Sequence, residues 1–369
     1  MSRKINAVMD NIFETLRSYV ADDDSYRVES VKRHIIAEGD ETKVCDFVKK
    51  AKINVVTRNS TSLCFFKYNE SRFLLAPSIY ETALDEIGFS VESDSSIIQG
   101  ASMLAISKGA LTLRSDITSI LIIEKCLGVL PEEGETDVVF NYSDILELFD
   151  YFSVYILNDS VFELIYEEDI NRLFCYLYAN NDISFSSSSV KRIKDITLLC
   201  SSRSIAGSIL NCLESSLVEY AFLQLYQCLE YLFRLNNSVL MATKHSISLE
   251  TAIDIVVENE FKVSEQDNLY SVIKNNASET SIDTFYGLIT DEESKSDDES
   301  KKWISCCKYI YKLRCNIAHL RYDQEVISDV SWEKCLEAMT DVIESIYRKR
   351  DREIIQICES KKMWRLLEW

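Results

Sequence analysis

The stretch KKWISCCKYIYKLRCNIAHLRY, residues 301–322, decides how the second half of this chain is interpreted. It carries several Lys and Arg side chains but no Asp or Glu, although the whole chain has a formal net charge of −20. At about 100° per residue, a helix over this stretch would separate a lysine face from an apolar face. The lysine face holds Lys301, Lys308 and Lys312, and the apolar face holds Trp303, Ile304, Cys307, Ile310 and Tyr311.

Arg314 falls on the apolar face of this predicted helix. An arginine there is costly to desolvate unless it meets a carboxylate, a phosphate or another set of acceptors. His319, one of only 3 histidines in the chain, follows in the same segment, with Asn316 between the two and Tyr322 just after. The segment therefore reads Arg-x4-His with a polar amide inside it.

This pattern resembles the HEPN domains (higher eukaryotes and prokaryotes nucleotide-binding), whose ribonuclease members carry an R-x4-6-H motif late in an all-helical domain. Arg314 and His319 match the motif, and Asn316 stands at its commonly polar position. The resemblance covers roughly residues 211–350. It implies cofactor-free and metal-independent RNA cleavage by a homodimer that joins two motifs, in a toxin or anti-phage effector. A tyrosine near the histidine in one toxin branch makes Tyr322 a supporting candidate.

RNA carries its own nucleophile, the 2′-hydroxyl, so a ribonuclease has to move protons and stabilise a crowded phosphorane. His319 suits proton transfer near neutral pH, and the Arg314 guanidinium suits the phosphorane because it donates a fork of hydrogen bonds. Glu230 is a candidate partner for Arg314. The candidate contacts for RNA phosphates are Lys308, Lys312 and Arg321. Two such motifs in a C2 dimer would supply more groups than one.

The alternative hypothesis is a catalytically silent HEPN-like regulator that binds a nucleotide or a protein. In that case Arg314 lines the core and pairs with an acid, while His319 ends its helix. Nuclease activity without added metal that is lost in His319→Ala would separate the two hypotheses.

Composition predicts a mainly α fold. The chain has 369 residues, enough for two domains, and only 8 Gly and 2 Pro, which favours long elements with few tight turns. Its 12 cysteines include no C-x-x-C pair and no histidine placed to complete a zinc site with one, so we expect free thiols in a reducing cytosol and no metal site. The first residues lack the uninterrupted apolar core of a signal peptide, and the most apolar later run, residues 117–130, is expected to be too short to cross a membrane. A cytoplasmic protein is expected, with any RNA contact confined to a local patch.

The polar run NNDISFSSSS, residues 180–189, predicts the connection between two domains. Residues 1–185 are expected to form a mixed α/β module that senses or regulates, with a protein or phage-derived trigger as its candidate partner. Residues 190–369 are expected to form the helical HEPN-like domain.

Periodicity divides the N-terminal module into helices and strands. Helices are predicted over residues 4–20, 28–36, 143–157 and 162–178. Strands are predicted over residues 53–57, 62–68, 72–76, 102–106, 109–114 and 137–142, and the second and third of these are expected to form a hairpin.

The C-terminal domain shows mostly helical spacing. Predicted helices cover residues 211–235, 248–261 with Ser248 as N-cap, 264–273, 281–289, 301–315 and 331–347, followed by a basic break at 348–352 and a final helix. An acidic loop is expected at 291–300.

Overall fold

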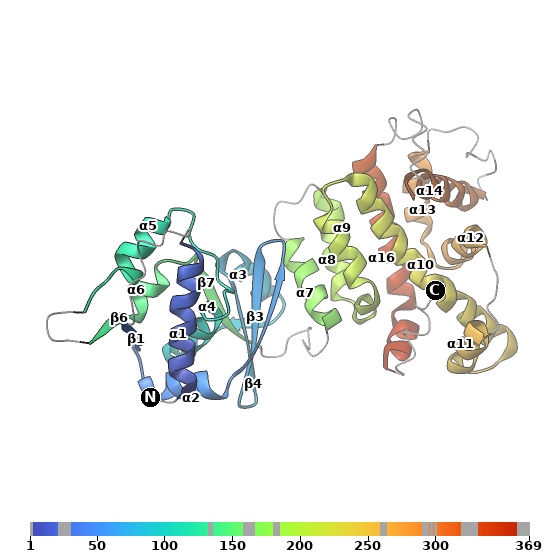
Figure 1. Cartoon of the computed structure of the whole chain (residues 1–369). Coiled ribbons are helices and arrows are strands. Elements are labelled where there is room, and N and C mark those ends of the chain that lie inside the picture. The colour runs from blue at the N-terminus through green and yellow to red at the C-terminus, as the bar shows by residue number, and fades with distance from the viewer. Residues whose placement is uncertain are drawn as a thin grey trace. The chain divides into compact units, whose positions relative to one another are not determined.

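The computed structural model divides into two compact units, Met1–Val161 and Phe162–Trp369 (Figure 1). It describes residues 3–20, 31–131, 136–157, 167–179, 185–258, 264–289, 295, 298, 301–318 and 331–359. The fold is mainly α: the N-terminal unit combines helices with strands, and the described part of the second unit is helical.

The boundary between the units lies before the predicted one at residues 185–190. Helix α7 (Glu167–Tyr178) packs against α8 (Ser187–Leu198) and α9 (Ala206–Glu214), so it belongs to the second unit. The apolar side chains of α7 are buried within the second unit. Part of the serine-rich run predicted as a connection instead starts α8, where the Ser186 hydroxyl accepts a hydrogen bond from the Ser189 amide at 3.3 Å.

A five-stranded sheet forms the centre of the N-terminal unit. Its strand order is β2-β3-β4-β7-β5, and every neighbouring pair is antiparallel. The predicted strands at 53–57, 62–68 and 72–76 are confirmed, as is the hairpin, whose turn places Asn69 at a φ of 52°. The strands are β2 (Lys52–Arg58), β3 (Thr61–Tyr68), β4 (Ser71–Pro77), β5 (Phe89–Val91) and β7 (Phe152–Leu157).

Helices α1 (Arg3–Ser18), α2 (Glu41–Lys50) and α4 (Ser95–Ile106) belong to the core of this unit. Phe47 of α2 is fully buried, and its ring lies 4.7 Å from Tyr68 and 6.0 Å from Phe73 of the sheet. A Cβ on Gly100 of α4 would lie only 2.8 Å from the Phe47 ring. Glycine at this position therefore lets α4 approach α2 closely.

Residues 28–36, predicted as helix, contain the strand β1 (Lys32–Ile36) instead; residues 28–30 lie outside the described part. β1 pairs in parallel with β6 (Asp137–Asn141), which confirms the strand predicted there. Arg33 points inward and donates to the carbonyls of Cys126 at 3.3 Å and Leu127 at 2.5 Å. Arg33 and Ile35 are the buried residues of β1, so burial alternates along the segment as it does in a strand. A helix was predicted because arginine is usually a surface residue, whereas Arg33 is buried.

Three further N-terminal predictions are wrong. Residues 102–106 belong to helix α4, and residues 109–114 form no strand beyond an isolated bridge between Leu113 and Phe149. Residues 143–157 divide into a short helix and strand β7. β7 pairs with β4 on one side and with β5 on the other, so it is an inner strand of the sheet. The remaining elements are η2 (Ser78–Tyr80), α3 (Glu81–Glu86), α5 (Ser119–Ile122), η3 (Ile123–Leu127) and α6 (Tyr142–Leu146).

Two long helices, α10 (Val218–His245) and α16 (Trp332–Glu359), contact each other in the second unit, where the Tyr347 hydroxyl donates to the Cys228 carbonyl at 3.0 Å. The predicted helix 211–235 is wrong at both ends, since the chain breaks at residues 215–217 and α10 continues to His245. Asn236 explains the continuation, because it is buried and donates to Ser271 at 2.8 Å. The basic stretch 348–352 likewise stays helical within α16.

The helices predicted over residues 248–261, 264–273, 281–289 and 301–315 are present where the structure describes them. The start of the predicted final helix is a continuation of α16 to Glu359, and residues 360–369 lie outside the described part. Ser248 accepts a hydrogen bond from the Thr251 amide at 3.1 Å, which confirms its role as a cap. These helices are α11 (Leu249–Glu258), α12 (Glu265–Asn276), α13 (Glu279–Gly287) and α14 (Lys302–Ala318), and η4 (Cys200–Ile205) precedes α9. Most of the predicted acidic loop at 291–300 lies outside the described residues.

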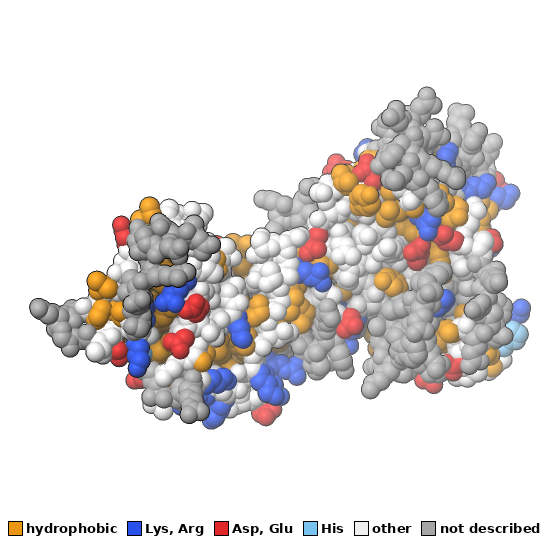
Figure 2. Space-filling model, in the orientation of Figure 1, with side chains coloured by type: hydrophobic (Ala, Val, Ile, Leu, Met, Phe, Trp, Pro, Cys, Tyr) orange, Lys and Arg blue, Asp and Glu red, His pale blue; other side chains and the backbone are white. Residues whose placement is uncertain are grey.

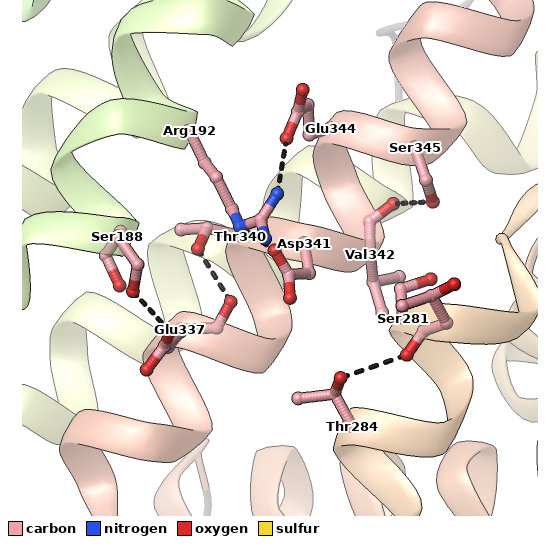
Figure 3. Close-up of polar contacts among 12 residues, drawn as sticks. Ser188, Arg192, Ser281, Thr284, Glu337, Thr340, Asp341, Val342, Glu344 and Ser345 are labelled. Atoms are coloured by element: carbon pink, nitrogen blue, oxygen red, sulfur yellow. Dashed lines mark hydrogen bonds and ion pairs between the residues drawn. The ribbon is translucent and has the colours of Figure 1, made fainter.

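A polar seam joins α8 to α16 (Figure 3). Arg192 of α8 reaches Asp341 and Glu344 of α16, the latter at 3.0 Å. Glu344 also accepts from Arg348 at 2.7 Å, and Ser188 donates to Glu337. These ion pairs fix which face of α16 meets α8.

The 10 cysteines described as free thiols are mostly buried, and only Cys45 and Cys315 are partly exposed among them. Within the described residues, no single helix has the length and apolar character of a membrane span, although the pair Ser187–Leu198 and Ser201–Glu214, bent by 116°, passes together on length and composition.

Candidate functional site

Arg314 lies in the C-terminal half of α14 and contacts side chains from two other helices. Its Nε is 3.0 Å from Glu265 Oε1, and its Nη2 is 3.6 Å from Glu230 Oε1. Its guanidinium also lies 5.7 Å from the centre of the Tyr226 ring. The Tyr226 hydroxyl donates to Glu265 Oε1 at 2.8 Å. We call these four residues the Arg314 cluster.

The local sequence explains why these side chains meet. Tyr226 and Glu230 are four residues apart on α10 and therefore share a face. Glu265 is the first residue of α12, and Ser264 caps that helix by accepting from the Asp267 amide at 3.1 Å. A carboxylate in the first helical turn is favoured by the helix dipole. Leu313 beside Arg314 is fully buried, so the arginine sits at the edge of the packed stripe.

The cluster is reached by solvent. The side chains of Arg314, Glu230 and Glu265 are 24%, 23% and 27% exposed, respectively. Tyr226, in contrast, is buried and forms the floor beneath the guanidinium. An anion could therefore approach Arg314 without unfolding the bundle.

Two carboxylates face one guanidinium, and burial affects each group differently. Burial, followed by repulsion from Glu265, raises the pKa of Glu230, and Arg314 offsets part of this. Burial, followed by the charge of Glu265, raises the pKa of Tyr226, so it stays protonated and keeps donating. Burial would lower the pKa of Arg314, but the two glutamates outweigh it and the net pKa is raised. The arginine stays charged.

The structure reports on some of the predicted site residues. It brings Glu230 to Arg314, the contact suggested by the sequence. Asn316 is half-buried, Lys308 is exposed and Lys312 is half-buried. The remaining candidates, His319, Arg321 and Tyr322, lie outside the described residues.

Sequence reasoning missed Glu265 and Tyr226. Glu265 belongs to a short helix far from Arg314 along the chain, and nothing in a single sequence marks the two as neighbours. Tyr226 could have been noticed, since it lies one turn before Glu230 on the same helix. Among the described residues, no group of three or more His, Cys, Asp or Glu side chains could hold a metal ion.

Replacing Glu230 with glutamine should change how stability depends on pH. A carboxyl whose pKa is raised on folding contributes stability that is present below its unfolded pKa and lost as pH rises through the folded value. We therefore expect Glu230→Gln to melt higher than the wild type near pH 7, with the difference disappearing as pH falls below the ordinary glutamate range. Thermal melts over a pH series measure this. A Glu230→Gln variant that melts lower at pH 7 would show that its attraction to Arg314 outweighs burial.

Comparisons with protein-family models, with curated protein sequences and with solved structures find no match for this chain. Function is therefore inferred from the Arg314 cluster and from the Arg-x4-His motif, which begins at Arg314.

Proposed function

We propose that the second unit is a metal-independent endoribonuclease in which Arg314 binds the reacting phosphate and His319 transfers the proton. The observation that carries this proposal is the partly exposed guanidinium of Arg314, held from below by Tyr226 and from the side by Glu265. Arg314 lies in the C-terminal half of α14, whose described part ends at Ala318, directly before His319 in the sequence. Arginine and histidine in one short segment supply a phosphate-binding group and a proton-transfer group.

The contacts of Arg314 indicate which edge of its guanidinium would bind the phosphate. The ion pair between Nε and Glu265, at 3.0 Å, is closer than the ion pair between Nη2 and Glu230, at 3.6 Å. Glu265 can therefore orient the guanidinium while the Nη edge turns to a phosphate. Such prior orientation lowers the cost of binding the transition state.

The wider parts of this proposal come from the motif. One motif supplies few groups, so a homodimer through the helical unit would complete the cleft. The N-terminal unit would receive the trigger, a protein or a phage-derived molecule, in a toxin or defence role. Free thiols that are mostly buried suit a reducing cytosol.

A second function is favoured by the charge of the cluster. With two glutamates and one arginine it carries a net charge of −1 when all three are ionised, which opposes a phosphate. This charge supports the catalytically silent regulator, in which Arg314 is a structural ion-pair partner and the unit binds a nucleotide or a protein.

The conservative change Arg314→Lys separates the two functions. Lysine keeps the positive charge but cannot donate the planar fork of hydrogen bonds. We expect wild-type protein to cleave RNA in EDTA and Arg314→Lys to lose about 10²-fold or more in rate, as when one oxyanion-binding donor is removed. Asp283→Asn on exposed α13 is the matched control and should keep full activity. Light scattering on the same samples should give a dimer.

The regulator is supported instead if purified wild-type protein binds nucleotide or a partner protein and leaves RNA intact. Cleavage that EDTA abolishes would contradict the metal-independent mechanism.

A further inference from the structure

Three basic side chains lie directly opposite one another on three neighbouring strands of the N-terminal unit. Lys52 of β2 is in register with Lys67 of β3, and Lys67 is in register with Arg72 of β4. All three are exposed. Adjacent strands are about 4.8 Å apart, so the row spans roughly 10 Å. We call Lys52, Lys67 and Arg72 the cation row.

Such an arrangement is unfavourable for the sheet itself. Like charges directly opposite on antiparallel strands repel and destabilise the pairing. A lysine on the edge strand β2 can discourage aggregation, but this does not account for the charges on the inner strands β3 and β4. An anionic ligand would offset the repulsion.

The surroundings of the cation row are basic in a chain whose net charge is −20. The segment 46–72 contains six Lys or Arg residues, and its acids are Asp46 and Glu70. Asp46 is already engaged, because it pairs with Lys50 at 2.8 Å and accepts from Tyr68 at 2.8 Å. Figure 2 shows Lys and Arg side chains gathered at the end of the N-terminal unit where α2 and the β3–β4 turn lie. The patch thus has a local excess of positive charge.

An aromatic side chain lies next to the cation row. Phe65 is two residues from Lys67 on β3, so both point to the same face of the sheet, and the Phe65 ring is partly exposed. A basic strip beside an aromatic ring fits single-stranded nucleic acid, whose phosphates meet the charges while a base stacks on the ring. An acidic membrane fits less well, because none of the exposed large apolar side chains falls in segment 46–72.

We propose that the cation row and Phe65 form a binding surface for a single-stranded polynucleotide, with the phosphates along the row and a base against Phe65. This goes beyond the proposed ribonuclease activity: it lies in the other unit, and binding there requires no cleavage. It gives the N-terminal unit a ligand class of its own.

The test compares two triple variants of the full chain with equal loss of charge. Lys52→Gln/Lys67→Gln/Arg72→Gln removes the cation row, and Lys108→Gln/Lys191→Gln/Lys244→Gln removes three exposed lysines elsewhere. Binding of a fluorescent single-stranded DNA oligonucleotide is followed by anisotropy over a salt series in EDTA. A matching RNA oligonucleotide is used in the His319→Ala background. Tighter binding of RNA than of DNA would identify RNA as the preferred ligand of this surface.

We expect the row variant to bind about 10- to 100-fold more weakly at low salt, and its slope of log K against log salt to shrink by about 2, because single strands release about 0.7 counterion per contact. The control variant should bind as the wild type does. Where the row variant melts below the wild type, Lys67→Gln alone takes its place, with a slope change of about 0.7. Phe65→Leu should weaken binding with the salt slope unchanged.

Three results would overturn the proposal. These are wild-type binding by the row variant, an equal loss in the control variant, and loss of binding to phosphatidylserine vesicles alone while the oligonucleotide still binds. The last would assign the surface to a membrane. Cleavage is not read in any arm, so the outcome is independent of the ribonuclease proposal.

Discussion

Cleavage of RNA in EDTA is expected to slow by about 10²–10⁴ when His319 is replaced with alanine, which is the range for a general acid–base group. The reason is that histidine is the type of side chain suited to proton transfer near neutral pH, whereas the guanidinium of Arg314 stays charged. Affinity for RNA should be nearly unchanged, because a neutral imidazole contributes little to holding phosphates. Single-turnover cleavage together with a separate binding measurement distinguishes rate from affinity.

Two controls accompany this variant. His245→Ala removes an exposed histidine at the end of α10 and should cleave at the wild-type rate. Lys308→Ala removes an exposed lysine of α14 that is a candidate phosphate contact; we expect weaker binding of single-stranded RNA and a salt slope smaller by about 0.7, with the rate at saturation unchanged. The half-buried Lys312 is the second such candidate. Cleavage by His319→Ala at the wild-type rate would remove His319 from the mechanism.

The largest effect on stability is expected for Asp169→Asn in α7, at about 3–5 kcal/mol of unfolding free energy. Asp169 and Arg172 are both fully buried and 2.8 Å apart, and Asp169 also accepts from Arg203 Nε at 2.8 Å. The substitution keeps the shape of the side chain but removes the only negative charge in these contacts. Buried Arg172 would then lose the carboxylate that lies 2.8 Å from its Nη1, which is costly.

Denaturant titration monitored by tryptophan fluorescence reports on unfolding of the second unit, because all 4 tryptophans lie in Phe162–Trp369. Asp283→Asn is the control: its 59% exposed side chain pairs with Lys302 at the surface, so its loss should cost less than about 1 kcal/mol. Equal effects in the two variants would mean that burial of the Asp169 pair is not what stabilises the second unit.

The β2–β4 region could be predicted because its evidence is local. Alternating apolar residues mark each strand, and Asn69, which tolerates a positive φ, marks the turn. Most helices of the second unit could be predicted for the same reason, since their buried faces repeat with helical spacing.

The failures have a shared physical cause, which is packing between distant segments. Strand β1 pairs with β6 about a hundred residues later, and a short apolar run by itself does not distinguish a strand from a helix. Helix α4 is buried over most of its surface, so it shows no polar face, although its N-cap Asp94 was visible in the sequence. Asn236 looked like a helix end because its hydrogen-bond partners Ser271 and Asn276 lie on another helix.

The candidate site was predictable only in part. Arg314 and its need for an acidic partner could be read from one helix, and Glu230 could be proposed from the amphipathic pattern of α10. Glu265, whose contact with Arg314 is the shorter of the two, could not, because α12 meets α14 only through tertiary packing.

The position of Cys315 gives the Arg314 cluster an internal chemical reporter. Cys315 follows Arg314 directly and is partly exposed; of the 10 described thiols, only Cys45 in the other unit shares that exposure. Buried thiols react slowly with alkylating reagents, so among the ten described thiols brief treatment followed by mass spectrometry would detect mainly modification of these two. The ratio of their modification would then report how often a ligand occupies the cluster, with no substitution in the chain and with Cys45 as the reference inside the same molecule.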